Sequence, residues 1–144
     1  MLNIQPGIYF HFLERCNLQE RSKLKEFIAS MFRKEKKSLR RLDYIFCTDD
    51  YLLSLNRDFL KHDYFTDIIT FDLSETDQIV GEVYISIDRV KDNAVSLENT
   101  FRQELLRVIF HGALHLCGFK DKKPKDIKLM RQKEEFYLGL HSKA

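Results

Sequence analysis

Two histidines separated by three residues constrain this chain more than any other feature of its 144-residue sequence. His111 and His115 lie within an apolar segment that runs from Leu105 to Leu116. The length and composition of this segment predict a helix, and on a helix residues i and i+4 share one face. Both imidazoles can therefore reach one cation from the same side of the helix.

A turn signal and a carboxylate follow the two histidines. Gly118 comes just after the end of the predicted helix, where a glycine in the left-handed conformation commonly reverses the chain. Asp121 lies three residues further on, so its carboxylate can fold back toward the histidines. Two nitrogens and one oxygen leave a fourth tetrahedral position open, which is typical of a catalytic zinc site. We therefore expect His111, His115 and Asp121 to bind one metal ion, with Zn²⁺ favoured and Ni²⁺ or Fe²⁺ also suited to these ligands.

The histidine segment resembles the signature H-G-x-L-H-L-x-G-[FY]-D-H of the YbeY family of bacterial ribosomal-RNA maturation endoribonucleases. Two further blocks match in order and spacing, and the similarity spans about residues 42–136. Leu55-Asn56 with residues 66–71 resembles L-N-x-x-[FY]-R followed by T-D-V-L-S-F, and residues 81–86 resemble G-D-I-x-I-S. The resemblance implies a metal-dependent endoribonuclease that acts on single-stranded RNA in rRNA maturation and ribosome biogenesis. It also implies an α+β architecture, with the metal-binding helix beneath a cleft that an edge strand borders.

Three positions depart from this family pattern. Asp121 stands where the family has its third histidine, and Lys120 replaces the aspartate before it. A carboxylate can bind zinc, but it lowers the net charge of the site by one unit, so bound water should have a higher pKa. Leu60 replaces the family's arginine, a natural phosphate partner, so this chain lacks that contact to a scissile phosphate.

Charge is unevenly distributed along the chain, although the net charge is only +2. Residues 21–41 carry nine basic against two acidic residues, and residues 120–133 carry seven against two. The intervening residues 42–100 carry four basic against thirteen acidic residues. If the fold brings the two basic segments together, a positive face next to a metal cleft would favour a polyanion such as RNA. Each segment alone is equally well explained as a solvated helix face.

Length and composition predict one domain over residues 1–144. The chain is 44% hydrophobic and contains 12 Phe, enough for a sizeable core. No apolar segment is long enough to span a membrane, and the N-terminus shows no secretory signal. Cys16, Cys47 and Cys117 are typical of free thiols in a reducing cytoplasm, with Cys117 a packing residue rather than a ligand. We expect a cytoplasmic protein whose partners are precursor ribosomal RNA and ribosomal proteins, with no membrane or DNA partner.

The hydrophobic pattern alternates between strands and helices and predicts an α+β fold with a mixed sheet of about four strands. Strands are predicted over residues 7–13, 41–48, 66–73 and 79–87, with the last two forming an antiparallel hairpin. The family resemblance implies that an edge strand borders the cleft, and we expect this to be the strand that contains Thr66 to Phe71. Helices are predicted over residues 17–37, 49–59, 88–97 and 100–116, and from Pro124 onward, with Asn17, Thr48 or Asp49, Asp88, and Asn99 or Thr100 as N-terminal caps.

A metal held by three ligands lowers the pKa of bound water and polarises a phosphoryl oxygen. The sequence leaves open whether hydroxide or the neighbouring 2′-hydroxyl would attack phosphorus. Glu104 and backbone carbonyls are the candidates to orient the imidazoles. No general base is identifiable.

Two other functions stay open. Zinc proteases of the H-E-x-x-H type carry a glutamate beside the first histidine, but here that position is Gly112. A peptidase would therefore need another carboxylate, such as Glu134 or Asp72. The other alternative is a non-catalytic factor that binds pre-ribosomal RNA or a ribosomal protein and keeps its metal in a structural role. Leu60 at the arginine position makes this alternative more credible.

Overall fold

A four-stranded mixed sheet lies at the centre of the computed structural model, which describes residues 5–143. The strand order is β1-β2-β4-β3. β2 runs parallel to β1 and to β4, whereas β3 pairs antiparallel with β4. The predicted α+β class, mixed sheet, β3–β4 hairpin and edge position of β3 are therefore confirmed. The strands are β1 (Gly7–Phe12), β2 (Ser38–Cys47), β3 (Ile68–Asp72) and β4 (Gln78–Ser86).

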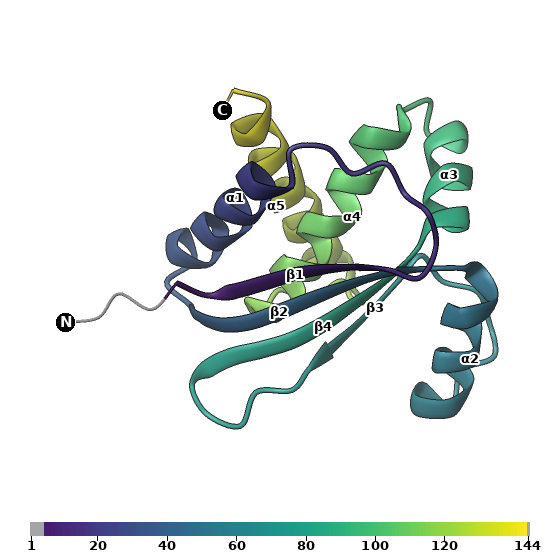
Figure 1. The fold of residues 1–144 in the computed structure, drawn as a ribbon, viewed down its shortest axis with the longest axis horizontal. Coiled ribbons are helices and arrows are strands. Elements are labelled where there is room, and N and C mark those ends of the chain that lie inside the picture. The colour runs from purple at the N-terminus through teal and green to yellow at the C-terminus, as the bar shows by residue number, and fades with distance from the viewer. Residues whose placement is uncertain (1–4, 144) are drawn as a thin grey trace.

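Helices cover the two faces of the sheet unequally. In Figure 1, α1, α4 and α5 lie together on one side of the strands, with α4 crossing the middle. On the other face α2 packs against Cys47, Ile69 and Tyr84, which forms a smaller hydrophobic cluster. The five helices are α1 (Arg21–Lys34), α2 (Asp49–Leu60), α3 (Ile87–Ser96), α4 (Phe101–Leu116) and α5 (Pro124–Ser142).

The core positions α4 directly on the sheet. Its apolar side chains, such as Ile109 and Leu114, are fully buried between β4 and the helices α1 and α5. The Tyr44 hydroxyl of β2 donates a 2.9 Å hydrogen bond to the carbonyl oxygen of Ile109. Gly112 brings the α4 backbone close to Val83 of β4. The helix that carries both histidines is therefore held at a fixed height above the sheet.

Two of the predicted helix starts are wrong, and two others are confirmed. Asn17 does not cap α1, because the connection after β1 stays irregular until Glu20 and is held against the core by the buried Leu18. Asp88 lies in the first turn of α3, and the Ser86 side chain caps that helix instead. Thr48 caps α2, and Thr100 caps α4 in a capping box with Gln103.

The two basic segments lie side by side, as the charge pattern allowed. Lys133 of α5 donates to Glu35, which follows α1, at 3.1 Å, and the Tyr137 hydroxyl donates to the same carboxylate. Phe27 of α1 also contacts the Tyr137 ring edge-on. These contacts hold α1 beside α5 (Figure 1).

Cys16, Cys47 and Cys117 are all free thiols, as predicted. Cys117 is buried in the main core, and burial raises the pKa of its thiol to about 12. Its predicted role in packing is therefore confirmed. Among residues 5–143, no helix combines the length and the apolar character needed to cross a membrane.

The close approach of α4 to β4 generates a stability prediction. A Cβ at position 112 would lie 2.7 Å from Cγ1 of the stiff, buried Val83. We expect Gly112→Ala to lower the free energy of unfolding by about 1–2 kcal/mol, because overpacking outweighs the higher helix propensity of alanine. Urea denaturation monitored by circular dichroism measures this change.

Gly139→Ala is the matched control, because a Cβ there meets nothing within 4 Å on the exposed side of α5. It should leave stability unchanged or raise it by up to about 1 kcal/mol. Equal stability of the two variants would contradict the packing argument.

Candidate metal centre

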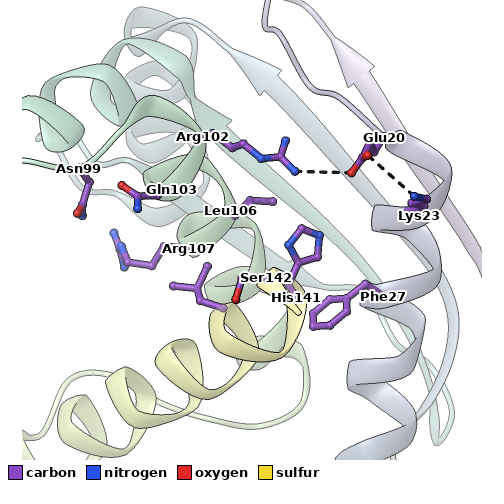
Figure 2. A pocket seen from close by; sticks show the side chains of 11 residues that line it. Glu20, Lys23, Phe27, Asn99, Arg102, Gln103, Leu106, Arg107, His141 and Ser142 are labelled. Atoms are coloured by element: carbon purple, nitrogen blue, oxygen red, sulfur yellow. Dashed lines mark ion pairs between the residues drawn. The ribbon is translucent and has the colours of Figure 1, made fainter. Parts of the chain in front are cut away.

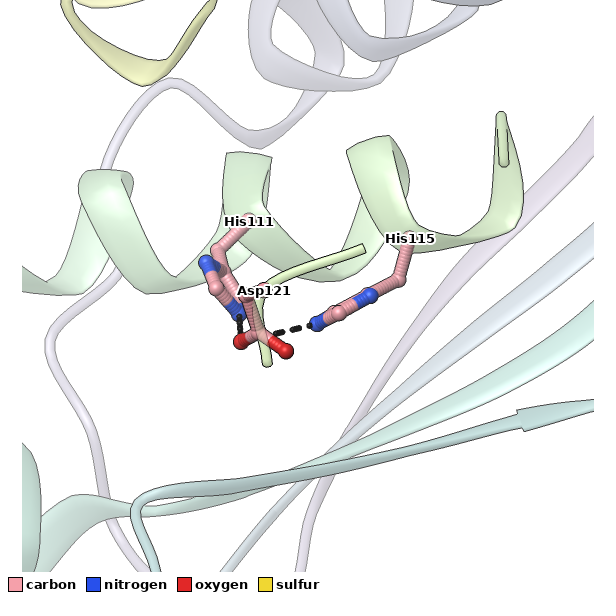
Figure 3. Close-up of side chains that lie close together, drawn as sticks. All are labelled: His111, His115 and Asp121. Carbon is pink, nitrogen blue, oxygen red and sulfur yellow. Dashed lines mark ion pairs between the residues drawn. The ribbon is translucent and has the colours of Figure 1, made fainter. Parts of the chain in front are cut away.

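His111 and His115 project from one face of α4 toward Asp121 (Figure 3). Their Nε2 atoms lie 3.1 and 3.3 Å from the same Oδ2 atom of Asp121. One ligand atom from each of the three residues lies within 4.8 Å of the others. The structure thus brings together the three residues singled out from the sequence. Two imidazole nitrogens and one carboxylate oxygen form a donor set that fits one zinc-like cation with an open position.

The turn after α4 explains how Asp121 reaches the histidines. Gly118 has a φ of 105°, in the left-handed region that favours glycine. The amide of Phe119 then donates to the Leu114 carbonyl oxygen at 3.1 Å, which reverses the chain at the helix end. The carbonyl oxygen of Phe119 in turn accepts a 2.9 Å hydrogen bond from His115 Nδ1. A proton on Nδ1 leaves the Nε2 lone pair facing Asp121, so the expectation of an orienting backbone carbonyl is confirmed.

Glu134 of α5 orients the other imidazole. Its Oε2 lies 2.6 Å from His111 Nδ1, and its Oε1 accepts a 3.1 Å hydrogen bond from Arg107. The prediction that Glu104 would do this is wrong, because both of its oxygens accept hydrogen bonds from Arg107 at 2.8 and 2.6 Å. Glu104 precedes His111 by about two helical turns, too far along α4 for direct contact.

Electrostatics favours a charged Glu134 and a neutral His115. Burial alone would raise the pKa of Glu134, but the hydrogen bond from His111 and the nearby Arg107 charge lower the pKa below its ordinary value. Burial, together with the neighbouring His111, lowers the pKa of His115. A neutral imidazole offers its nitrogen lone pair to a cation, and the charged carboxylate behind His111 increases the basicity of that ring.

A cleft of about 630 Å³ opens over the three residues. Strand β3 lines its other side, so the expected cleft at an edge strand is present. Leu60 lies at the cleft, half-exposed, where the family has an arginine. Lys122 is the only lysine or arginine among the described residues that line the cleft, so most of the basic side chains lie elsewhere.

The loop between α2 and β3 forms one rim of the cleft. Asn56 near the end of α2 is buried, and its Nδ2 donates a 2.8 Å hydrogen bond to the Tyr64 carbonyl oxygen. Its backbone carbonyl oxygen accepts a 3.1 Å hydrogen bond from the His62 amide. His62 and Tyr64 stack with their ring centroids 5.1 Å apart, and both line the cleft. Sequence reasoning did not assign a role to Asn56, although it lies in the Leu55-Asn56 block that matched the family pattern.

Comparison with known proteins agrees with this site. A family model described as Endoribonuclease YbeY matches residues 14–141. The chain belongs to the YbeY endoribonuclease family. A relative named Endoribonuclease YbeY from Cytophaga hutchinsonii is 52% identical and is aligned over 91% of this chain and 94% of its own length. The Flavobacterium psychrophilum protein of the same name is 44% identical, and the alignment covers 92% of this chain and 95% of that protein. A solution structure of a Thermotoga maritima protein matches with a TM-score of 0.65 and 32% sequence identity, and the match covers 91% of this chain and 86% of that protein.

The Glu134 contacts generate a prediction about stability and pH. We expect Glu134→Gln to lower the free energy of unfolding by about 1–3 kcal/mol at pH 7, because Arg107 and His111 lose a charged, buried acceptor. The folded-state pKa of Glu134 lies below its ordinary value of 4.5. Its contribution is therefore present above pH 4.5 and is lost as the pH falls through the folded-state pKa.

Urea unfolding at pH 7 and at successively lower pH should show the difference between wild type and Glu134→Gln shrinking in acid. The exposed neighbour Glu135 makes no hydrogen bond or ion pair to a described residue, so Glu135→Gln is the control. A constant difference at every pH would count against a charged Glu134.

Proposed function

We propose that this chain is a metal-dependent endoribonuclease that cuts single-stranded RNA, with His111, His115 and Asp121 as its metal ligands. The convergence of two Nε2 atoms and one Oδ2 atom within 4.8 Å at the cleft carries the proposal. Membership in the YbeY endoribonuclease family supports RNA hydrolysis. We further propose Zn²⁺ as the metal, precursor ribosomal RNA as the substrate in ribosome biogenesis, and the cytoplasm as the location.

The residues around the cluster suit this chemistry. A bound cation of this type lowers the pKa of water and polarises a phosphoryl oxygen. Hydrogen bonds to Glu134 and to the Phe119 carbonyl keep each Nε2 directed at the cluster. Lys122 supplies a positive charge for phosphate at the cleft. The stacked rings of His62 and Tyr64 on the rim offer a surface for an unpaired base.

The arrangement argues against a peptidase. Gly112 occupies the position of the glutamate in H-E-x-x-H proteases, and it packs against Val83 beneath the helix. The Glu134 carboxylate is engaged by Arg107 and His111 behind the imidazole, so it is not free to activate water in the cleft. Asp72 lines the cleft but is not part of the three-residue cluster.

Metal content tests the ligand assignment. We expect about one metal ion per wild-type chain by elemental analysis, as for a mononuclear site, and loss of that metal in His115→Ala and Asp121→Ala. His62→Ala and Asp72→Asn are matched controls, because these residues line the same cleft outside the cluster. Wild type without metal after reconstitution with zinc, or control variants that lose it equally, would overturn the assignment.

The same protein preparations distinguish an endoribonuclease from a peptidase and from a non-catalytic RNA-binding factor. A single-stranded ribosomal RNA fragment should be cleaved by metal-loaded wild type and not after chelation, and a peptide should stay intact. Salt-sensitive RNA binding with no cleavage at any metal would instead identify a non-catalytic RNA-binding factor.

The third ligand should set the pH dependence of cleavage. Asp121→His replaces a negative ligand with a neutral one and raises the net charge of the site by one unit. Water bound there should have a lower pKa, so we expect the rising limb of the pH–rate profile to move to lower pH. Single-turnover cleavage between about pH 5 and pH 9, roughly two units on either side of neutrality, measures this shift. A shift to higher pH, or an unchanged profile, would contradict Asp121 as a ligand.

A further inference from the structure

A second hollow lies between α1, α4 and α5, and it shares no lining residue with the metal cleft. It encloses about 560 Å³, a volume typical of small-molecule and cofactor sites. Figure 2 shows side chains from all three helices surrounding it. We call this hollow the three-helix pocket. It is lined by Glu20, Lys23, Phe27, Asn99, Arg102, Gln103, Leu106, Arg107, Leu138, His141 and Ser142.

Positive charge predominates in the three-helix pocket. Arg107 is already bound by Glu104 and Glu134, but Lys23 and Arg102 share one carboxylate, that of Glu20. Both cations lie 4.0 Å from Glu20, beyond hydrogen-bond distance, and neither donates a hydrogen bond to any residue the structure describes. Lysine and arginine side chains held in this way are available to bind an anion, and arginine suits phosphate geometry.

The floor of the pocket is aromatic. The rings of Phe27 and His141 meet edge-on with their centroids 5.0 Å apart, and His141 also contacts Phe110 at 5.7 Å. Burial and the nearby Arg102 charge lower the pKa of His141, which favours a neutral ring against the aromatic cluster. Neutral aromatic surfaces stack nucleic-acid bases without sequence preference. The cations of the pocket suit the phosphate of a nucleotide, and the adjacent aromatic surface suits its base.

The three-helix pocket and the metal cleft lie along one stripe of α4. Gln103, Arg107, His111 and His115 follow one another at four-residue intervals, so each lies next to the following one on the surface of α4. The first two line the pocket, and the last two line the cleft. Gln103 lies about 12 Å along the helix axis from His111. Asp67 of the cleft approaches Arg107 at 3.7 Å, so the two hollows meet at this arginine.

We propose that the three-helix pocket is a nucleotide subsite for the single-stranded RNA substrate. Arg102 and Lys23 bind a backbone phosphate of the strand, and Phe27 with His141 supports the adjacent base. The inference rests on the proposed function for its ligand class, but the subsite acts in RNA binding and not in the chemical step. It provides a phosphate contact that Leu60 does not offer in the metal cleft.

Equilibrium binding of a fluorescently labelled single-stranded RNA oligonucleotide tests the subsite. With Lys23→Ala/Arg102→Ala we expect Kd to rise about tenfold and the slope of log Kd against log salt to fall by about one. Lys34→Ala/Arg131→Ala is the matched control, because it removes the same charge from exposed positions outside the pocket. Equal weakening by the two double variants would overturn the proposal, since it would reflect overall charge alone.

A variant that removes a negative charge from the pocket provides a second test, with the opposite expected effect on RNA binding. Glu20→Gln removes the only carboxylate among the described residues that line the pocket, and it should tighten RNA binding several-fold. Unchanged or weaker RNA binding by this variant would overturn the placement of phosphate beside Glu20. Titration with AMP separates a free nucleotide from a strand. Pocket-dependent AMP binding with RNA affinity unaltered by Lys23→Ala/Arg102→Ala would reject the RNA subsite.

Cleavage kinetics distinguish this subsite from the metal centre. Lys23→Ala/Arg102→Ala should keep its metal and its kcat while KM for RNA rises about tenfold. Loss of kcat without a change in KM would overturn a pure binding role. If wild type cleaves no RNA, the proposed function fails, whereas the binding measurements still decide the subsite.

Discussion

The buried carboxylate of Glu134 joins the candidate metal centre to the rest of the fold. It comes from α5, accepts a hydrogen bond from Arg107 and lies 2.6 Å from His111 Nδ1 on α4. Burying these charges costs free energy that only good geometry offsets, so the two helices are restricted to the packing that satisfies all three groups. The orientation of one imidazole thus depends on the docking of the C-terminal helix.

Helix α4 serves the core and the site at once. One face carries fully buried residues such as Ile109 and Leu114, and another carries His111 and His115. Gly112 lies between these histidines and allows the helix to approach Val83 closely. Because His111 and His115, two of the three ligand candidates, belong to a rigid, buried element, they lose little conformational freedom when a substrate binds.

The sequence predicted those parts of the structure that local patterns specify. The i, i+4 histidines, the Gly118 turn and Asp121 span eleven residues, so helix geometry together with the glycine turn signal placed them together. Alternation and apolar segments likewise predicted the four strands. Caps such as Asn17 and Asp88 were wrong, because packing of the connecting segments selected Glu20 and Ser86 instead. The position of β3 at the edge came from family resemblance and not from periodicity.

Contacts between residues that lie far apart in the sequence could not be predicted from local sequence patterns. Glu134 reaches His111 across 23 residues, and nothing in the local pattern separates it from the exposed Glu135. The role of Asn56 depends on a loop conformation that only the tertiary structure reveals. Such partners become visible only when helix packing is known.

Asp121 differs from its two companions in how little of the fold depends on it. It lies in the turn after α4, its side chain is 37% exposed, and its contacts are with the two histidine rings. A change there alters the charge at the cleft while the packing of α4 is preserved. At Asp121, the charge of the proposed metal site can therefore change without a change in the packing that stabilises the fold.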